Sequence, residues 1–214
     1  MVEPAYLAAT RISYDTVAED YAEVVKGLFA NFPLGRHLLA AFAELVRGDG
    51  GGPIADVGCG PGQVTALLSS LGVQAFGVDL SPNMVGIARR TYPDLRFEVG
   101  SMTALDVPDG ELGGVVAWWS IFHVPREELP GVLDGFHRVL APGGRLLVGF
   151  HVGDERLSPR SAYGGHPVSY TVDLHRPEAM ADLLGESGFE VTMRLVTEGA
   201  KRQGACLLAR KAVG

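Results

Sequence analysis

The stretch IADVGCGPGQVTALL, residues 54–68, decides the fold, because it places three glycines at alternate positions behind an aspartate and before an apolar run. Residues 54–57 are predicted to form a short buried strand and residues 63–71 a helix, with the glycines in the turn between them. Glycine permits backbone angles that a Cβ forbids, and it lets a ligand lie directly against the chain. Such a turn lies at the carboxyl edge of a parallel sheet, where ligands of open α/β folds bind.

The residues around this turn favour a ligand with a cationic portion. A phosphate prefers a helix N-terminus with no carboxylate nearby, whereas Asp56 comes just before the turn. The dinucleotide pattern G-x-G-x-x-G/A is also broken, because Gln63 stands where its third glycine or alanine belongs. An ammonium or a sulfonium fits better beside the acid. Asp56 fits a second interpretation equally well, as a structural cap for the backbone amides of the turn.

A second acid follows one strand later, in FGVDLSPNM at residues 76–84. The apolar strand ends in Asp79, and Ser81 with Pro82 is expected to begin the next helix, since serine is a favoured N-cap and proline a favoured first residue. A carboxylate at such a strand end can accept both hydroxyls of a ribose. The two motifs together imply an amino acid joined to a nucleoside.

Length, charge and cysteine content narrow the class of protein. A chain of 214 residues, 47% hydrophobic, is predicted to form one domain over residues 1–214. A net charge of -7 disfavours nucleic acid as a partner. The two cysteines are far apart and no His/Cys cluster has metal-ligand spacing, so we expect a cytoplasmic protein without a metal. No leader pattern and no apolar run of roughly 20 residues is present, so we expect no membrane attachment.

Strand-like and helix-like patterns alternate along the chain, which is typical of a doubly wound α/β fold. Helices are predicted at residues 14–28, 36–46 and 177–187, and strands at residues 54–57, 74–78, 95–99, 115–119, 145–151, 189–196 and 206–210. The last two strands follow each other directly, which predicts a closing antiparallel hairpin. We expect N-terminal cap helices within residues 1–48, a cofactor-binding core over residues 54–151 and a candidate substrate loop at residues 153–169.

Five motifs in order make the chain resemble the class I S-adenosylmethionine-dependent methyltransferases. They are ADVGCGPG, GVDLSPNM, FEVGSMTALDVPDG, GGVVAWWSIFHVP and RVLAPGGRLLVGF, and together they cover residues 54–151. The N-terminal SYDTVAEDYAE and the closing GFEVTMRLV and CLLARK are similar to the cap helix and final hairpin of members that act on small molecules. The resemblance implies a Rossmann-like, mostly parallel seven-stranded sheet and S-adenosylmethionine as the cofactor.

The resemblance also implies which residues meet the cofactor. These are Gly58, Cys59 and Gly60 at the methionine portion, Asp79 at the ribose, Leu80 and Met84 beside the adenine, and Ser101 and Met102 at its edge. The family often has aspartate where Ser101 stands, and a hydroxyl can still bond the adenine amino group. Cys59 has no histidine or lysine beside it, which favours a packing role over a nucleophile.

Aromatic residues complete the predicted cofactor site. Tyr14 and Tyr21 lie about two turns apart on one helix face and could form a wall of the cavity. Trp118 and Trp119 end a buried strand, and one of them must face the cofactor because adjacent strand residues point to opposite sides. We assign this position to Trp118.

Methyl transfer from a sulfonium requires alignment rather than a covalent intermediate. A histidine can accept the proton of the incoming nucleophile. His123 and His151 follow or end strands at the carboxyl edge of the sheet, so His123 is our first candidate base and His151 our second. Either residue could instead orient a loop through a hydrogen bond.

The predicted acceptor is a small metabolite, methylated at an O, N or C atom. In the candidate substrate loop, Arg156, Arg160, Tyr163 and His166 could recognise a carboxylate or phenolate, although each arginine taken singly is better explained as a solvated surface residue. Two alternatives stay open: a protein that binds S-adenosylmethionine without transferring its methyl group, and a nicotinamide-dependent oxidoreductase, which Gln63 disfavours. The sequence leaves the oligomeric state open.

Overall fold

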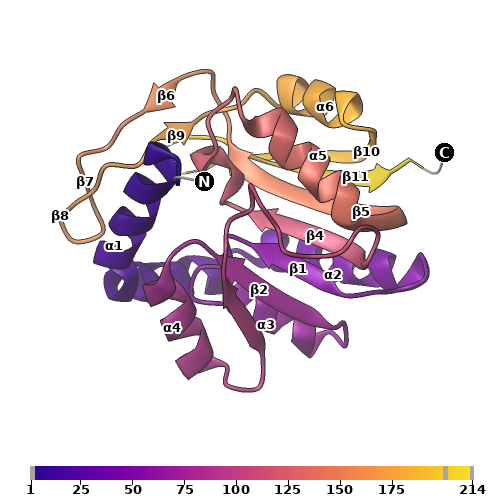
Figure 1. Ribbon diagram of the computed structural model, residues 1–214, viewed down its shortest axis with the longest axis horizontal. Helices are drawn as coiled ribbons and strands as arrows, with labels where there is room; N and C mark the ends of the chain where they lie inside the picture. The colour runs from indigo at the N-terminus through magenta and orange to yellow at the C-terminus, as the bar shows by residue number, and fades with distance from the viewer. Residues whose placement is uncertain (1–2, 200–201, 213–214) are drawn as a thin grey trace.

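A seven-stranded sheet forms the centre of the computed structural model, which describes residues 3–199 and 202–212 (Figure 1). Its strands, in the order β10-β11-β5-β4-β1-β2-β3, are β1 (Ile54–Val57), β2 (Ala75–Asp79), β3 (Arg96–Val99), β4 (Leu112–Trp118), β5 (Leu140–His151), β10 (Phe189–Thr197) and β11 (Gly204–Lys211). Strands β3, β2, β1, β4 and β5 lie next to one another in this order and pair in parallel. Strand β11 runs antiparallel to both β5 and β10. The predicted mostly parallel sheet with a C-terminal hairpin is confirmed.

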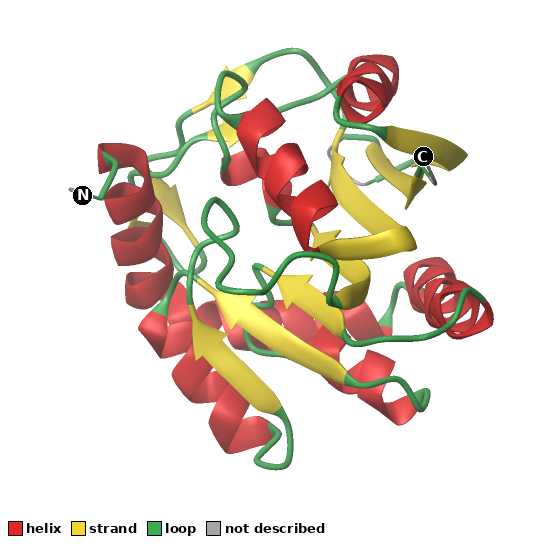
Figure 2. Cartoon of the chain, turned by 45° about the vertical axis from the view of Figure 1, so that its right-hand side comes forward, coloured by secondary structure: helices red, strands yellow, loops and turns green. Residues whose placement is uncertain are grey.

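Helices cover both faces of the sheet (Figure 2). They are α1 (Ala5–Ala30), α2 (Pro33–Gly48), α3 (Gln63–Ser70), α4 (Pro82–Thr91), α5 (Leu129–Val139) and α6 (Pro177–Glu186). Successive strand residues serve opposite faces: Val115 belongs to the core cluster under α5 and α6, and Val116 to the cluster under α2 and α3. Strands buried on both faces explain the nearly unbroken apolar runs in the sequence.

Several element boundaries differ from the sequence prediction, and three of these differences have an identifiable cause. Helix α1 begins at Ala5, nine residues before the predicted start, because Pro4 precedes a run that is rich in good helix formers. Strand β4 ends at Trp118 because Trp119 has a left-handed φ of 55°. Strand β5 begins at Leu140, five residues early, because Leu140 pairs with Leu112 across an irregularity in the ladder.

The segment after β5 is less irregular than the sequence predicts. It contains two short antiparallel pairs, β6 (Arg156–Leu157) with β9 (Val172–Asp173), and β7 (Ser161–Ala162) with β8 (His166–Pro167). The β7–β8 turn lies beside α1 (Figure 1). The backbone N–H of Ser169 donates to the Ser13 hydroxyl at 2.9 Å, which attaches the segment to that helix.

The strand order reverses at β1, which has β2 on one side and β4 on the other. Open α/β sheets bind ligands at the carboxyl ends of strands where the order reverses. The short helix η1 (Ile121–His123) follows β4 at this edge. Within the described part of the chain, no helix combines the length and apolarity needed to cross a bilayer.

Candidate functional site

A cavity that is partly open to solvent lies at the carboxyl ends of β1, β2 and β4. Helix α1 covers one side of it with Leu7, Thr10, Arg11, Tyr14 and Tyr21. The rest of the lining comes from the turns and loops that follow β1, β2, β3 and β4.

The glycine turn after β1 lets the loop after β4 pack closely against the end of β1. Gly58 has a φ of 73°, and a Cβ on it would lie 2.3 Å from the Cβ of Ser120. The Ser120 hydroxyl donates to the Val57 carbonyl at 2.7 Å, which fixes the loop after β4 against the end of β1. A Cβ on Gly60 would project toward Tyr21, which also lines the cavity, at 3.5 Å. The bare backbone at Gly60 therefore keeps the space between the turn and α1 free.

Asp79 ends β2, and its carboxylate connects the glycine turn after β1 to the start of α4. One carboxylate oxygen accepts the backbone N–H of Gly60 at 2.7 Å, and the other accepts the N–H of Ser81 at 2.8 Å. Burial raises the pKa of Asp79 to about 6, and the two backbone hydrogen bonds oppose that rise. Two oxygens offer about four acceptor positions, so the carboxylate can accept further hydrogen bonds from the cavity.

Helix α1 is held over the cavity by Asp15. Its carboxylate accepts the Ser81 hydroxyl at 2.5 Å and the Asn83 N–H at 3.1 Å, and its carbonyl accepts the Asn83 amide at 3.0 Å. Ser81 is the N-cap of α4, as predicted, and accepts the Met84 N–H. A carboxylate at the N-terminus of α4 is favoured by the helix dipole.

A hydrogen-bonded chain runs from α1 across the cavity wall. The Tyr14 hydroxyl lies 2.7 Å from Nε2 of His123, and Nδ1 of His123 lies 2.8 Å from the Thr171 carbonyl. Burial lowers the pKa of His123 to about 4 and raises the pKa of Tyr14 well above its usual value. Tyr170 stacks on Tyr14 with 5.4 Å between ring centres, and Tyr21 meets Tyr14 edge-on at the same distance.

The opposite wall carries four of the residues predicted to meet adenine, and all four line the cavity: Leu80, Met84, Ser101 and Met102. The hydroxyls of Ser101 and Thr103 lie 2.8 Å apart, and Ser101 also accepts the Thr103 N–H. This local turn fixes the position of the Ser101 side chain.

Two side chains predicted at the cofactor lie elsewhere. Asp56 is 1% exposed; one oxygen accepts the Thr65 hydroxyl at 2.7 Å, and the other is buried without a partner. Burial raises its pKa to about 7. The side chain of Cys59 packs with Val85 and Phe97 under α4 rather than lining the cavity. Burial raises its pKa well above the usual value, so it is an unreactive thiol.

The tryptophan assignment needs a correction as well. Trp118 packs toward α2, with its ring 6.3 Å from Phe32, and Trp119 lines the cavity in its place. The left-handed backbone at Trp119 turns the chain as β4 ends, and Gly204 leaves room for its ring. His151 lies behind Trp119 and Phe122, about 5 Å from each ring, and is not part of the cavity lining.

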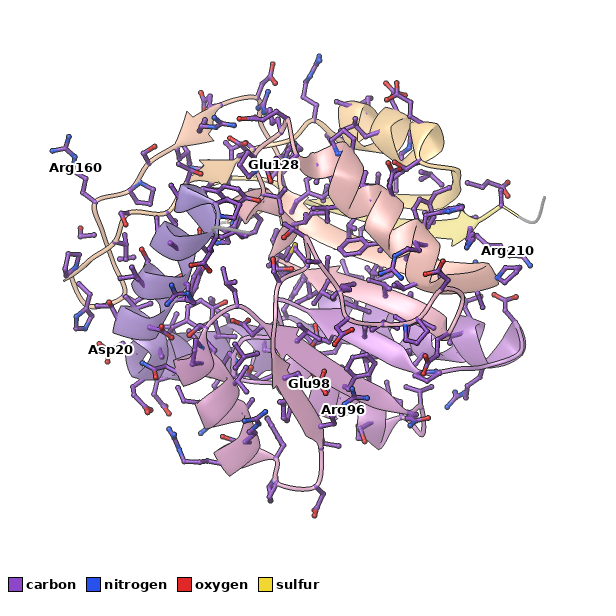
Figure 3. The ribbon with its side chains drawn as sticks, in the orientation of Figure 1. Asp20, Arg96, Glu98, Glu128, Arg160 and Arg210 are labelled. Carbon is purple, nitrogen blue, oxygen red and sulfur yellow. The ribbon has the colours of Figure 1, made fainter. Side chains whose placement is uncertain are left out.

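The candidate substrate loop does not direct its cations into the cavity. Arg156 binds both oxygens of Asp173 and also Glu127, and Arg160 points away from the molecule (Figure 3). His166 lies 2.7 Å from Asp20 of α1. Tyr163 meets Tyr21 edge-on at 4.9 Å, so this loop contributes packing behind the cavity wall.

Several cavity residues escaped sequence analysis. Leu7, Thr10 and Arg11 were missed because the first helix was predicted to start too late. Asp15, which does not line the cavity but holds α1 over it, was also missed, although it stands next to Tyr14 in the quoted N-terminal motif. Among the described residues, no three His, Cys, Asp or Glu side chains come together as a metal ion would require.

The chain is similar to known proteins over most of its length. Residues 54–144 match a family model described as a methyltransferase domain. An uncharacterised methyltransferase of Synechocystis sp. is 27% identical over 172 residues, 76% of this chain and 78% of that protein. An S-adenosyl-L-methionine-dependent Diels-Alderase of Neonectria sp. is 26% identical over 77% of this chain and 70% of its own length. Three demethylmenaquinone methyltransferases among the curated relatives are matched over only 41 to 43% of their length.

Among solved structures, the magnesium protoporphyrin IX methyltransferase from Synechocystis PCC 6803 with bound S-adenosylmethionine has a TM-score of 0.72. The two chains are 19% identical, and the match covers 99% of this chain and 100% of that one. At this identity the likeness concerns the fold, which has the same arrangement over its full length.

Proposed function

Because the chain belongs to the class I S-adenosylmethionine-dependent methyltransferases, a family whose cofactor is S-adenosylmethionine, we propose that it transfers a methyl group to a small metabolite from a cofactor bound in this cavity. The observation that supports this most directly is the junction of Gly60 and Asp79. Bare backbone and a carboxylate with free acceptor positions lie within one hydrogen bond of each other, at the point where the strand order reverses.

The residues of the cavity fit the two ends of such a cofactor. Asp79 would accept the ribose hydroxyls, Leu80 and Met84 would enclose the adenine, and Ser101 and Met102 would lie at its edge. Gly58 and Gly60 would leave room for the amino-acid portion, and the rings of Tyr14 and Trp119 would close that end in place of Trp118. When bound, the cofactor supplies an activated methyl group on a sulfonium.

The protein's part in the reaction is alignment and exclusion of water. The acceptor atom must meet the methyl group in line with the carbon–sulfur bond, at roughly 3 to 3.5 Å. The cover that α1 provides keeps the cavity enclosed on that side. The small metabolite, rather than a macromolecule, is proposed because the acceptor must share this covered space with the cofactor. The cytoplasmic location stays a prediction from sequence.

Transfer of a labelled methyl group tests this proposal. Incubation of the protein with methyl-labelled S-adenosylmethionine and metabolite extracts should yield one labelled small product, identified by mass spectrometry. Tight binding of the cofactor with no labelled product from any extract would favour the alternative of a protein that binds it without methyl transfer. The similarity of the chain to an S-adenosyl-L-methionine-dependent Diels-Alderase is the reason to test this alternative. Binding of a reduced nicotinamide, with none of S-adenosylmethionine, would support the oxidoreductase.

A first prediction concerns Asp79. Asp79→Ala should weaken binding of S-adenosylhomocysteine by about 10- to 100-fold, because it removes a carboxylate that would hydrogen-bond the ribose. Isothermal titration should give one site per chain for the wild type. Asp94→Ala, which changes an exposed acid before β3, is the matched control. Equal affinities for the two variants would remove Asp79 from the site.

A second prediction concerns the candidate substrate loop. Replacing residues 158–168 with a Gly-Ser linker removes Tyr163 from its contact with Tyr21 and should abolish methylation while leaving cofactor affinity within a few-fold. Steady-state rates and titrations on the same preparation measure both. Full activity of the linker variant would place acceptor specificity in α1 instead.

A further inference from the structure

In the two hydrogen bonds that join Tyr14, His123 and Thr171, only one assignment of donors and acceptors is possible. A carbonyl oxygen only accepts hydrogen bonds, so Nδ1 of His123 must bear the hydrogen that it shares with Thr171 at 2.8 Å. In the neutral imidazole, Nε2 is then an acceptor, and the Tyr14 hydroxyl must be its donor at 2.7 Å. The tautomer of His123 and the orientation of the Tyr14 hydroxyl are thus fixed together.

This direction determines what Tyr14 can offer to the cavity. Both Tyr14 and His123 line the cavity, but the hydrogen of the tyrosine hydroxyl is directed at His123. The oxygen of Tyr14 is left with lone pairs for another partner. A molecule that meets Tyr14 here is therefore recognised by a hydrogen that it donates, and a carboxylate or a thiolate has none to give.

We propose that Tyr14 binds a hydroxyl group of the acceptor as a hydrogen-bond acceptor, that His123 receives the proton through Tyr14, and that the enzyme is an O-methyltransferase acting on an alcohol or a phenol. This inference rests on the proposed function and names the substrate class of the same site. Tyr14 is the catalytic residue, since it touches the reacting group, and His123 acts through it as a positioning residue.

The transfer balances in atoms and charge. A lone pair of the acceptor oxygen forms the new oxygen–carbon bond as the carbon–sulfur bond breaks, and the electron pair of the broken bond stays on sulfur. The hydroxyl proton passes to the Tyr14 oxygen while the hydrogen of Tyr14 passes to Nε2 of His123. The products are a neutral methyl ether, a neutral thioether and an imidazolium whose Nδ1–H stays on the Thr171 carbonyl.

The basicity of His123 separates oxygen from nitrogen as the methylated atom. Burial, with a smaller contribution from His151 of β5, lowers the pKa of His123 to about 4. A protonated ether is a strong acid and gives up its proton to so weak a base. A methylated ammonium keeps its proton, as a lysine ammonium of pKa roughly 10 does. The titratable groups around the imidazole of His123 are Tyr14 from α1, Tyr170 and His151. None of them places a negative charge beside it.

Nitrogen-15 spectra of histidine in the protein saturated with S-adenosylhomocysteine test the chain without an acceptor. The His123 signals are assigned by their loss in His123→Gln. We expect an unprotonated Nε2 and a protonated Nδ1 from pH 8 down to pH 5, and a shift of the Nε2 signal alone in Tyr14→Phe. A hydrogen on Nε2, or a titration of His123 near pH 6.5, overturns the proposal.

The kinetics of the labelled-methyl reaction provide a second test of the proposal. Tyr14→Phe and His123→Gln should lower kcat by about 100-fold or more, the usual contribution of a positioned proton acceptor, and leave the KM for S-adenosylmethionine within about two-fold. Tyr170→Phe is the matched control, because it removes a hydroxyl from the ring stacked on Tyr14 and keeps the Tyr14–His123 hydrogen bond. A Tyr14→Phe variant that loses cofactor affinity as much as turnover overturns the assignment.

The labelled product decides the substrate class. A methyl ether supports the proposal, and a methylated amine, thioether or ester overturns it. If no extract yields a labelled product, the proposed function fails, and the histidine spectra by themselves still confirm or overturn the hydrogen-bonded chain.

Discussion

Asp56 and Asp79 end up in different chemical environments, although each stands at the end of a strand beside the glycine turn. Asp79 receives two backbone N–H groups and faces the cavity. Asp56 receives only the Thr65 hydroxyl, and its second oxygen is buried without a partner. An ionised carboxylate with an unpaired buried oxygen is costly. Asp56 therefore belongs to the folding energetics of this region, but it binds the Thr65 hydroxyl of α3 and not the backbone amides of the turn that the sequence analysis offered as its structural partners.

The protonation of Asp56 makes stability depend on pH. Its pKa rises from about 3.8 in the unfolded chain to about 7 in the fold, so the folded state binds more protons between these values. Stability from this group is therefore greatest below pH 4, falls as the pH rises from 4 to 7, and is lower by roughly 4 kcal/mol above pH 7. Asp56→Asn removes this titration. Between pH 5 and pH 8, we expect the free energy of unfolding of the variant to rise relative to that of the wild type by one to a few kcal/mol.

Urea unfolding of both proteins at the two pH values measures this third prediction. Asp94→Asn, at an exposed position, should show no such gain. Parallel pH dependences of the wild type and Asp56→Asn would contradict the assignment of a raised pKa to Asp56.

At the scale of elements, α1 is the part of the molecule that turns an open crevice into a covered cavity. Its contacts reach the α4 N-terminus through Asp15, the loop after β4 through Tyr14, and the segment before β9 through Ser13. Near its N-terminus, the Tyr6 hydroxyl donates to Glu128 at 2.6 Å, at the entrance to α5 (Figure 3). These contacts join α1 to elements that are distant in sequence, so its position depends on the whole fold.

A fourth prediction follows from the Asp15 contacts. Asp15→Ala should speed dissociation of S-adenosylhomocysteine by about 10-fold or more, because the charged hydrogen bonds that hold α1 on α4 are lost. Stopped-flow displacement measures the rate. Glu19→Ala is the matched control on the same helix, since its ion pair with Arg90 of α4 is exposed and contributes about 0 to 1 kcal/mol. Equal rates in the two variants would show that Asp15 does not hold the cover.

The sequence predicted the sheet because its signals are local: buried apolar strands, a glycine turn and a serine–proline helix start each depend on neighbouring residues. It missed the choice between Trp118 and Trp119, because the left-handed angle at Trp119 results from packing against Gly204, far along the chain. It also misplaced the cations of the substrate loop, since Arg156 is paired by Asp173 through a two-residue strand pairing too short to recognise.

The partner of His123 was hidden for a similar reason. His123 was identified as a candidate base from its place after a strand, but the Tyr14 hydroxyl comes from the first helix and the Thr171 carbonyl from a segment without regular structure. Both partners depend on tertiary packing over more than 40 residues of chain, which no local pattern records.

At the scale of the whole molecule, the cavity gathers residues from α1 to the loop after β4, and ligand binding is therefore coupled to folding of most of the chain. As a fifth prediction, S-adenosylhomocysteine at 100 times its Kd should stabilise the fold by about 2.7 kcal/mol and raise Tm accordingly. Scanning calorimetry, with tryptophan fluorescence and circular dichroism as separate probes, should give one coincident transition. A first transition insensitive to the ligand would show that the elements around the cavity unfold separately.

The cover formed by α1 affects how fast the spent cofactor can leave the cavity. Because the spent cofactor would lie under a helix held along its N-terminal half, its departure is a conformational event rather than simple diffusion. The interval between successive turnovers would then be set by how often α1 lifts. Retained product would act as a brake on the enzyme, one that strengthens as the surrounding concentration of S-adenosylhomocysteine rises.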